Sequence, residues 1–180
     1  MATIGTFKKV GNDFQGEIIT LSLQAKGVRV DGVGIQGHWF MDFPRVDEIE
    51  AYVLALARLK LKLIITELDI GVLPFCHLDI PKADLSSFDA ETKKILNPYS
   101  NTLPNAVQKD QAKRYADLFS LFRKHRDKFS RVTFWGVHDG QSWRSYLPIG
   151  GRTEYPLLFD RRRQPKPAVS AIIKVARGKS

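Results

Sequence analysis

Cysteine is almost absent from this sequence, which has Cys76 alone among its 180 residues. A single thiol forms no intrachain disulfide, and redox chemistry is a poor expectation for it. Histidine is scarce as well: His38, His77, His125 and His138 lie in different predicted elements and follow no metal-ligand spacing. The sequence therefore predicts no disulfide and no metal site.

Long apolar runs and phosphate-binding motifs are also missing. No stretch approaches the roughly 20 apolar residues that a membrane-spanning helix needs. The start, MATIGTFKKVGNDF, lacks the apolar core of a secretory signal. Neither a glycine-rich phosphate loop nor a serine nucleophile elbow occurs. We therefore expect no membrane partner, no signal peptide in this chain and no cofactor.

The overall composition is ordinary for one globular domain with a hydrophobic core. Apolar residues make up 43% of the chain and charged residues 26%. The net charge of +9 raises nucleic-acid binding as an interpretation. The basic residues are dispersed, however, and only residues 161–163 form a tight cluster. We expect a single domain over residues 1–180 without a nucleic-acid partner, with residues 1–14 as a lead-in of no clear periodicity.

Hydrophobic periodicity divides residues 15–176 into alternating strands and helices. In the first helix Ile18 and Leu21 are expected to face inward, and Asp47 is placed to cap the second. Predicted strands cover residues 28–38, 61–70 and 131–138, and predicted helices cover residues 17–24, 47–60, 107–128 and 167–176. Residues 71–106 carry several prolines and form a long connection, which in a compact domain is usually functional.

The stretch at residues 61–70, LKLIITELDI, is the centre of this arrangement. Its apolar, β-branched run is typical of a strand buried on both faces of a parallel sheet. It ends with Glu67 and Asp69, and buried carboxylates are costly unless they have partners or a use. Alternation along a strand places both on one face. From spacing alone they could be catalytic, a metal pair or strand-end solvation.

Polar and aromatic side chains follow all three predicted strands. Three successive strand–helix crossovers imply parallel strands, whose carboxyl ends meet at one edge, where βα-barrel active sites lie. A complete barrel needs about 250 residues. The sequence therefore predicts an α/β fold of the (β/α)8 TIM-barrel type, present here as a partial barrel of about three strand–helix units. The residues gathered at its edge would be Gln36, His38, Glu67, Asp69, Trp135, His138 and Trp143.

Four motifs carry a family resemblance: GVRVDGVGIQGHW, IITELDI, VTFWGVHDGQSW and PLLFDRRRQPKPA. In this order and spacing they closely resemble the carboxyl-terminal half of glycoside hydrolase family 10, the endo-1,4-β-xylanases, from about Gln24 to Ala176. The resemblance implies retaining hydrolysis of xylan or xylo-oligosaccharides by two glutamates. Glu67 matches the nucleophile, His38 the histidine that hydrogen-bonds it, and Asp69 the carboxylate that holds the histidine.

The resemblance also assigns the walls of the sugar site. Trp135 and Trp143 match tryptophans beside the cleavage point, and Gln36 matches a polar residue close to the nucleophile. His138 is grouped with these substrate-binding residues as a loop neighbour. For a polysaccharide hydrolase of this family the implied location is secreted or periplasmic.

One half of the family's machinery is missing from the sequence. The family's acid/base glutamate follows an asparagine, and this chain contains no Asn–Glu pair. The amino-terminal barrel strands are missing too. Three alternatives follow: a non-catalytic xylan-binding half-barrel, a homo-oligomer or complementing amino-terminal fragment that closes the barrel, or Asp139 or Asp42 as a substitute acid.

Overall fold

The computed structural model describes residues 2–4, 9–10, 13–74 and 82–178, so Cys76 and His77 lie outside the described residues. The strands are β1 (Ala2–Ile4), β2 (Lys9–Val10), β3 (Asp13–Phe14), β4 (Gly32–Ile35), β5 (His38–Phe40), β6 (Lys62–Gly71), β7 (Ala83–Asp84), β8 (Phe129–Phe134) and β9 (Ile149–Gly150). The α-helices are α1 (Gln15–Ala25), α2 (Val46–Arg58), α3 (Ala90–Leu96), α4 (Asn105–Lys124) and α5 (Pro167–Ala176). Short 3₁₀ turns cover Leu85–Ser87, Asp139–Gln141 and Trp143–Ser145.

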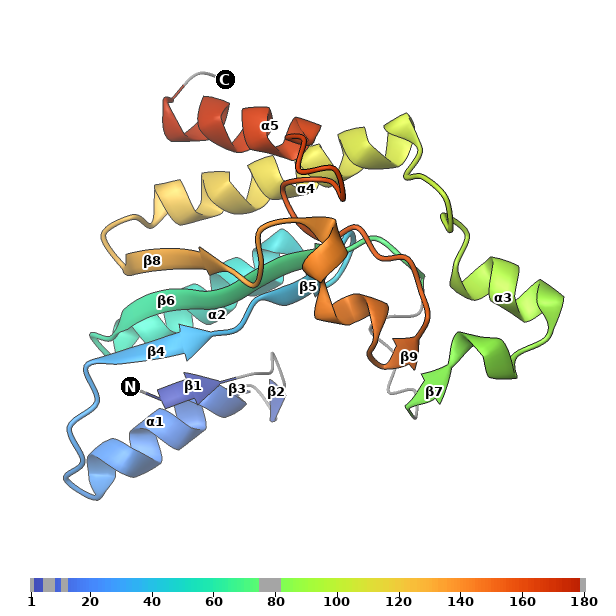
Figure 1. Ribbon diagram of the computed structural model, residues 1–180. Helices are drawn as coiled ribbons and strands as arrows, with labels where there is room; N and C mark the ends of the chain where they lie inside the picture. The colour runs from blue at the N-terminus through green and yellow to red at the C-terminus, as the bar shows by residue number, and fades with distance from the viewer. Residues whose placement is uncertain (1, 5–8, 11–12, 75–81, 179–180) are drawn as a thin grey trace.

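The main sheet is parallel, and β6 is its central strand (Figure 1). β4 and β5 pair with one side of β6, β8 pairs with the other side, and β1 pairs with β4. The chain thus passes through three strand–helix units, β4/β5–α2, β6–α4 and β8–α5. This confirms the predicted partial barrel, to which β1 adds a further short parallel strand at the edge.

The strand predicted over residues 28–38 is two strands that are separated at Gly37. Gly37 has φ of +83°, and a Cβ there would lie 2.9 Å from Cγ2 of Ile65. Only glycine adopts this conformation in so little space. The prediction of one continuous strand is therefore wrong: β4 begins at Gly32, and the bend re-aims β5 so that His38 pairs with Asp69.

The hydrophobic core lies between the sheet and the helices α2 and α4. Alternate residues of β4 and β6 point to this side, as the period of a strand requires, and they meet one apolar stripe of each helix. Its largest fully buried side chains include Tyr52, Tyr115, Ile49, Leu56, Leu63, Ile65 and Leu118. The helices therefore cover one face of the sheet, as on the outside of a barrel.

The opposite face of the sheet is open. Lys62, Arg131 and Thr133 are exposed there, and Ile64 and Thr66 are half-buried. In a closed barrel this face would be the filled interior. Within the described residues β1 and β8 each have one strand neighbour, so both ends of the sheet are edges.

Three local predictions need correction. Leu21 of α1 is 47% exposed, because Thr20 rather than Leu21 takes the buried position of that helix. The N-cap of α2 is Arg45, whose N–H donates to Glu48, while Asp47 lies in the first turn and pairs with the Arg45 guanidinium. The long connection contains α3, whose first N–H groups donate to Asp89.

Candidate active site

Glu67 and Asp69 lie in the second half of β6, on the same side of the strand, and both contact the ring of His38. Nε2 of His38 is 3.1 Å from Oε2 of Glu67, and Nδ1 is 3.0 Å from Oδ1 of Asp69. The bend at Gly37 produces this geometry, because it starts β5 beside the outer end of β6. His38 is therefore within hydrogen-bond distance of both Glu67 and Asp69, the two carboxylates that the sequence predicted to act with it.

Asp69 accepts hydrogen bonds from other side chains besides His38. Nε1 of Trp143 donates to its Oδ2 at 2.8 Å, and the guanidinium of Arg144 donates to its Oδ1 at 2.8 Å. The Asp69 side chain is only 1% exposed. A buried carboxylate needs such partners, and these donors fix the position from which Asp69 holds His38.

The sequence alone did not predict that Arg144 belongs to this site. It is 4% exposed, and its guanidinium also donates to the carbonyl of Trp39 at 3.1 Å. Gly71 makes room for it, because a Cβ there would lie 3.0 Å from Nη1 of Arg144. The available signal was an arginine directly after Trp143, in the segment that follows β8, but the pattern alone does not distinguish it from a surface cation.

The His38 ring links the two carboxylates through its two nitrogens. Because Asp69 accepts hydrogen bonds from its other neighbours, the consistent assignment puts a proton on Nδ1 of His38. The contact between Nε2 of His38 and Oε2 of Glu67 fixes the orientation of the Glu67 carboxyl group.

The predicted substrate-binding residues lie at different distances from His38 and Glu67. The Trp143 ring lies 4.9 Å from the His38 ring and the Trp135 ring 6.4 Å from it, centroid to centroid. Trp135 is 49% exposed, so it presents part of its ring to the solvent near His38. Gln36 points its amide at Glu67 over a long 3.5 Å. The structure brings these side chains together at one edge of the sheet.

His138 has different neighbours. Its Nδ1 accepts the N–H of Gly140 at 3.2 Å, and its backbone pairs with Phe159. Among the described residues it makes no hydrogen bond to Gln36 or Glu67. Its role in substrate binding stays a prediction.

Asp139, one of two residues considered as a substitute acid, is buried away from solvent. Its carboxylate accepts the N–H of Leu157 at 2.8 Å and pairs with Lys166 at 3.2 Å. Burial raises the pKa of Asp139 to about 6, against the opposing effect of Lys166. Asp42, the other candidate, is exposed in the turn after β5.

No group of three or more His, Cys, Asp or Glu side chains among the described residues is placed to hold a metal ion. None of the described helices combines the length and the apolar character that crossing a membrane requires.

Known proteins share both the sequence and the fold. The endo-1,4-β-xylanase of Geobacillus stearothermophilus is 37% identical over 154 residues, which are 86% of this chain and 41% of that protein. Endo-1,4-β-xylanase A of Xylanibacter ruminicola is 40% identical over 157 residues, 85% of this chain and 41% of its own. The chain thus spans about two fifths of the length of these curated relatives.

Solved structures give the same result. A GH10 endoxylanase from a sugarcane soil metagenome superposes with a TM-score of 0.77 at 38% identity, over 91% of this chain and 46% of that one. A variant solved in complex with xylotriose superposes with a TM-score of 0.70 at 34% identity, over 88% of this chain and 43% of its own. The family model of glycosyl hydrolase family 10 matches residues 13–175, and with the fold and the edge-of-sheet cluster this shows that the chain belongs to glycosyl hydrolase family 10.

Proposed function

We propose that this chain provides the nucleophile half of a retaining endo-1,4-β-xylanase. The observation that carries the proposal is the Glu67–His38–Asp69 arrangement, with distances of 3.1 and 3.0 Å, beside two tryptophan rings at the carboxyl edge of a parallel sheet. Glu67 is 18% exposed, so a carboxylate oxygen is accessible to a substrate while the histidine holds the other.

In this proposal Glu67 attacks the anomeric carbon of a xylose unit. The new bond joins a Glu67 oxygen to that carbon as the bond to the leaving oxygen breaks, and water then cleaves the glycosyl ester with net retention. His38 donates to Glu67 and is held by Asp69, which orients the attacking group. Trp135 and Trp143 form apolar walls against which sugar rings can pack.

The proton for the leaving oxygen must come from a second carboxyl group about 5–5.5 Å from the nucleophile in a retaining enzyme. Asp139 is a poor source, because Lys166 and the Leu157 N–H already bind its carboxylate and its side chain is fully buried. We therefore assign the acid to residues outside this sequence, on the half of the barrel that the relatives possess in addition.

This assignment predicts a dependence on the leaving group. A dinitrophenyl β-xylobioside has a leaving group that needs no protonation, whereas xylan has a poor one. The chain should release dinitrophenol and should cleave xylan weakly. Glu67→Ala should lower dinitrophenol release at least about a thousandfold, the scale on which loss of a nucleophile acts.

The matched control is Glu91→Gln, at an exposed glutamate in the first turn of α3. It should retain the parent rate. Equal rates for the parent and Glu67→Ala would refute the assignment of Glu67 as nucleophile. Circular dichroism spectra of all three proteins should be the same, which separates loss of the nucleophile from loss of the fold.

A second candidate function is a half-barrel that binds xylan or a complementing fragment without turning over by itself. The open face of the sheet favours it, since a cavity of about 530 Å³ lies beside Lys62 and Ile64 of β6. Its lining combines apolar and charged side chains: Leu23, Val28, Val30 and Ile64 with Arg29, Asp31 and Lys62. Unpaired sheet edges are prone to associate. Sedimentation of the purified chain distinguishes the cases: a folded monomer at all concentrations argues against assembly through these edges.

Xylan is an extracellular polymer, so an enzyme that hydrolyses it must reach it outside the cytoplasm. We therefore propose a secreted or periplasmic location for the whole protein. Fractionation of the source cells, with an antibody to this chain, would test it.

A further inference from the structure

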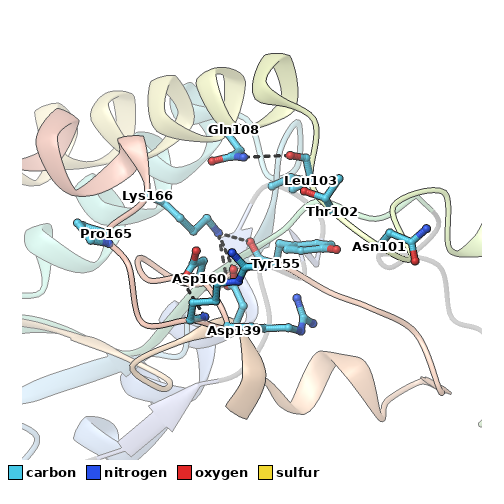
Figure 2. Close-up of a pocket in the computed structure, with 11 residues that line it drawn as sticks. Asn101, Thr102, Leu103, Gln108, Asp139, Tyr155, Asp160, Pro165 and Lys166 are labelled. Carbon is cyan, nitrogen blue, oxygen red and sulfur yellow. Dashed lines mark hydrogen bonds and ion pairs between the residues drawn. The ribbon is translucent and has the colours of Figure 1, made fainter.

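A second cavity lies away from the Glu67 cluster, between the start of α4, the segment 101–103 and the loop 160–166 (Figure 2). Its volume is about 350 Å³, which is in the range of small-molecule sites. None of the residues that surround Glu67 lines it. The family resemblance assigned no role to this region, and the sequence alone indicated only a surface arginine cluster at 161–163.

Two arginines border this cavity, and one of them is held in place. Arg161 stacks on Tyr155, with its guanidinium carbon 4.6 Å from the ring centroid, and it donates to the carbonyl of Glu154 at 2.8 Å. Arg162 is exposed, and its guanidinium has no ion-pair partner in the part of the chain that the structure describes. Two guanidinium groups beside one cavity are suited to bind a carboxylate.

The floor of the cavity adds no free charge. Lys166 points at Asp139 and at the carbonyl of Tyr155, which its ammonium group reaches at 2.7 Å (Figure 2). The pair is nearly neutral as a unit, so the cationic character of the cavity comes from Arg161 and Arg162.

The remaining lining consists mainly of hydrogen-bond acceptors. Oδ1 of Asp160 accepts the backbone N–H groups of Arg162 and Gln164, each at 2.8 Å, which leaves Oδ2 for another donor. Nε2 of Gln108 donates to the carbonyl of Leu103 at 2.9 Å, which leaves its carbonyl oxygen as an acceptor. These acceptors suit hydroxyl donors, and the Asp160 charge disfavours a doubly charged anion such as phosphate.

We infer that this cavity is a non-catalytic subsite for a uronic acid, a sugar that has several hydroxyl groups and one carboxylate. Arg161 and Arg162 bind the carboxylate, and Asp160 and Gln108 accept hydrogen bonds from ring hydroxyls. The inference rests on the proposed action on xylan, since uronic acids are acidic side groups that such a polysaccharide can bear. The site would hold a decorated chain at a place distinct from the cleavage point.

The test titrates D-glucuronate into the 180-residue chain and follows the backbone amide signals of residues 160–164 and 166 by NMR. D-xylose and acetate are the comparison ligands, because one lacks the carboxylate and the other lacks the ring hydroxyls. Glucuronate should shift these signals and bind at least about fivefold more tightly than either. Arg162→Gln should weaken glucuronate binding about tenfold, as loss of a charge-assisted bond does.

Arg163→Gln is the matched control, because Arg163 is an exposed neighbour that does not line the cavity. It should bind glucuronate like the parent, and so should Glu67→Ala, which separates this site from the proposed catalysis. Acetate binding as tight as glucuronate, no shift at residues 160–164 and 166, or parental affinity in Arg162→Gln would each overturn the inference. A parent chain that binds glucuronate but releases no dinitrophenol from the xylobioside would instead refute only the proposed function.

Discussion

Two buried aspartates on neighbouring parts of the sheet edge have opposite surroundings. Asp69 on β6 is bound by His38, by Trp143 and by the Arg144 guanidinium, all on its two carboxylate oxygens. Asp139, after β8, accepts one backbone N–H and pairs with the ammonium group of Lys166. Both side chains are at most 1% exposed.

Asp139 and Asp69 differ in how their surroundings act on the carboxylate charge. At Asp139 burial is the larger effect, and it raises the pKa to about 6 although Lys166 opposes it. Burial also lowers the pKa of Lys166. A buried ion pair of this kind contributes little net stability. The Asp69 group, by contrast, orients a histidine that reaches the proposed nucleophile, so we expect its loss to affect both stability and activity.

The largest effect is expected from Asp69→Asn. The change leaves the buried Arg144 guanidinium without its counter-charge, which costs about 3–5 kcal/mol of unfolding free energy. It also replaces one of the two accepting oxygens by an NH2 donor, so that His38, Trp143 and Arg144 can no longer all be satisfied. With His38 less firmly oriented, dinitrophenyl xylobioside hydrolysis should fall at least about a hundredfold. Urea unfolding and initial rates measure the two effects. Parental activity would show that Asp69 does not position the histidine.

A smaller effect of opposite sign is expected from Asp139→Asn. The folded-state pKa of about 6 lies above the ordinary 3.8, so the stability from proton binding is present below about pH 4 and lost as pH rises to about 6. The loss is on the order of 3 kcal/mol. Asparagine resembles the protonated form, although it leaves the buried Lys166 ammonium without its counter-charge. Relative to the parent, the unfolding free energy of the variant should therefore rise by about 1–3 kcal/mol between pH 4 and pH 7.

The measurement is the difference between parent and Asp139→Asn unfolding free energies from pH 4 to pH 7. A difference is needed because other carboxylates act in the opposite direction: the pKa of Glu50, for example, is lowered by its hydrogen bonds to Lys124 and His125. Such groups lose stability as pH falls. A flat difference curve would mean that Asp139 titrates normally in the fold.

Lys166→Met tests how strongly Lys166 affects the pKa of Asp139. Lys166 and Arg161 are the cations that hold the Asp139 pKa down against burial. Without Lys166 the pKa should rise further, and the pH at which stability declines should move up by about one unit. Urea unfolding over the same pH range measures it. If the pH at which stability declines does not change, Asp139 and Lys166 are not electrostatically coupled.

The smallest effect is expected from Trp143→Phe. The ring remains, but the N–H that donates to Asp69 at 2.8 Å is lost. Since His38 and Arg144 still bind Asp69, unfolding free energy should fall by only about 1–2 kcal/mol. A loss as large as that of Asp69→Asn would mean that Asp69 depends on this one donor.

Much of the fold was predictable from residue pattern. The apolar run before Glu67 required a central buried strand, and the stripe of Tyr115, Leu118 and Phe122 required a long helix against it. The break at Gly37 was not predictable, because it depends on how closely β6 approaches. The prediction that Leu21 faces inward failed for a similar reason, because the neighbours of α1 in the fold decide which of its faces is buried.

The site was predictable where a motif specified it. Glu67, His38 and Asp69 came from local sequence, and the structure places them in contact, although their catalytic roles stay proposals. Arg144 was missed, because an isolated arginine in a loop has no periodicity that indicates burial.

The sequence by itself determined the family, through four motifs that resemble it, and also the parallel direction of the strands and the side chains expected at their carboxyl edge. The strand direction follows from residue order, since crossovers between strands leave few arrangements. Only the tertiary structure decided that Arg144 binds Asp69, that Lys166 binds Asp139, and that Arg161 and Arg162 border a cavity. Those pairings join residues from separate loops, whose approach depends on packing that no local pattern records.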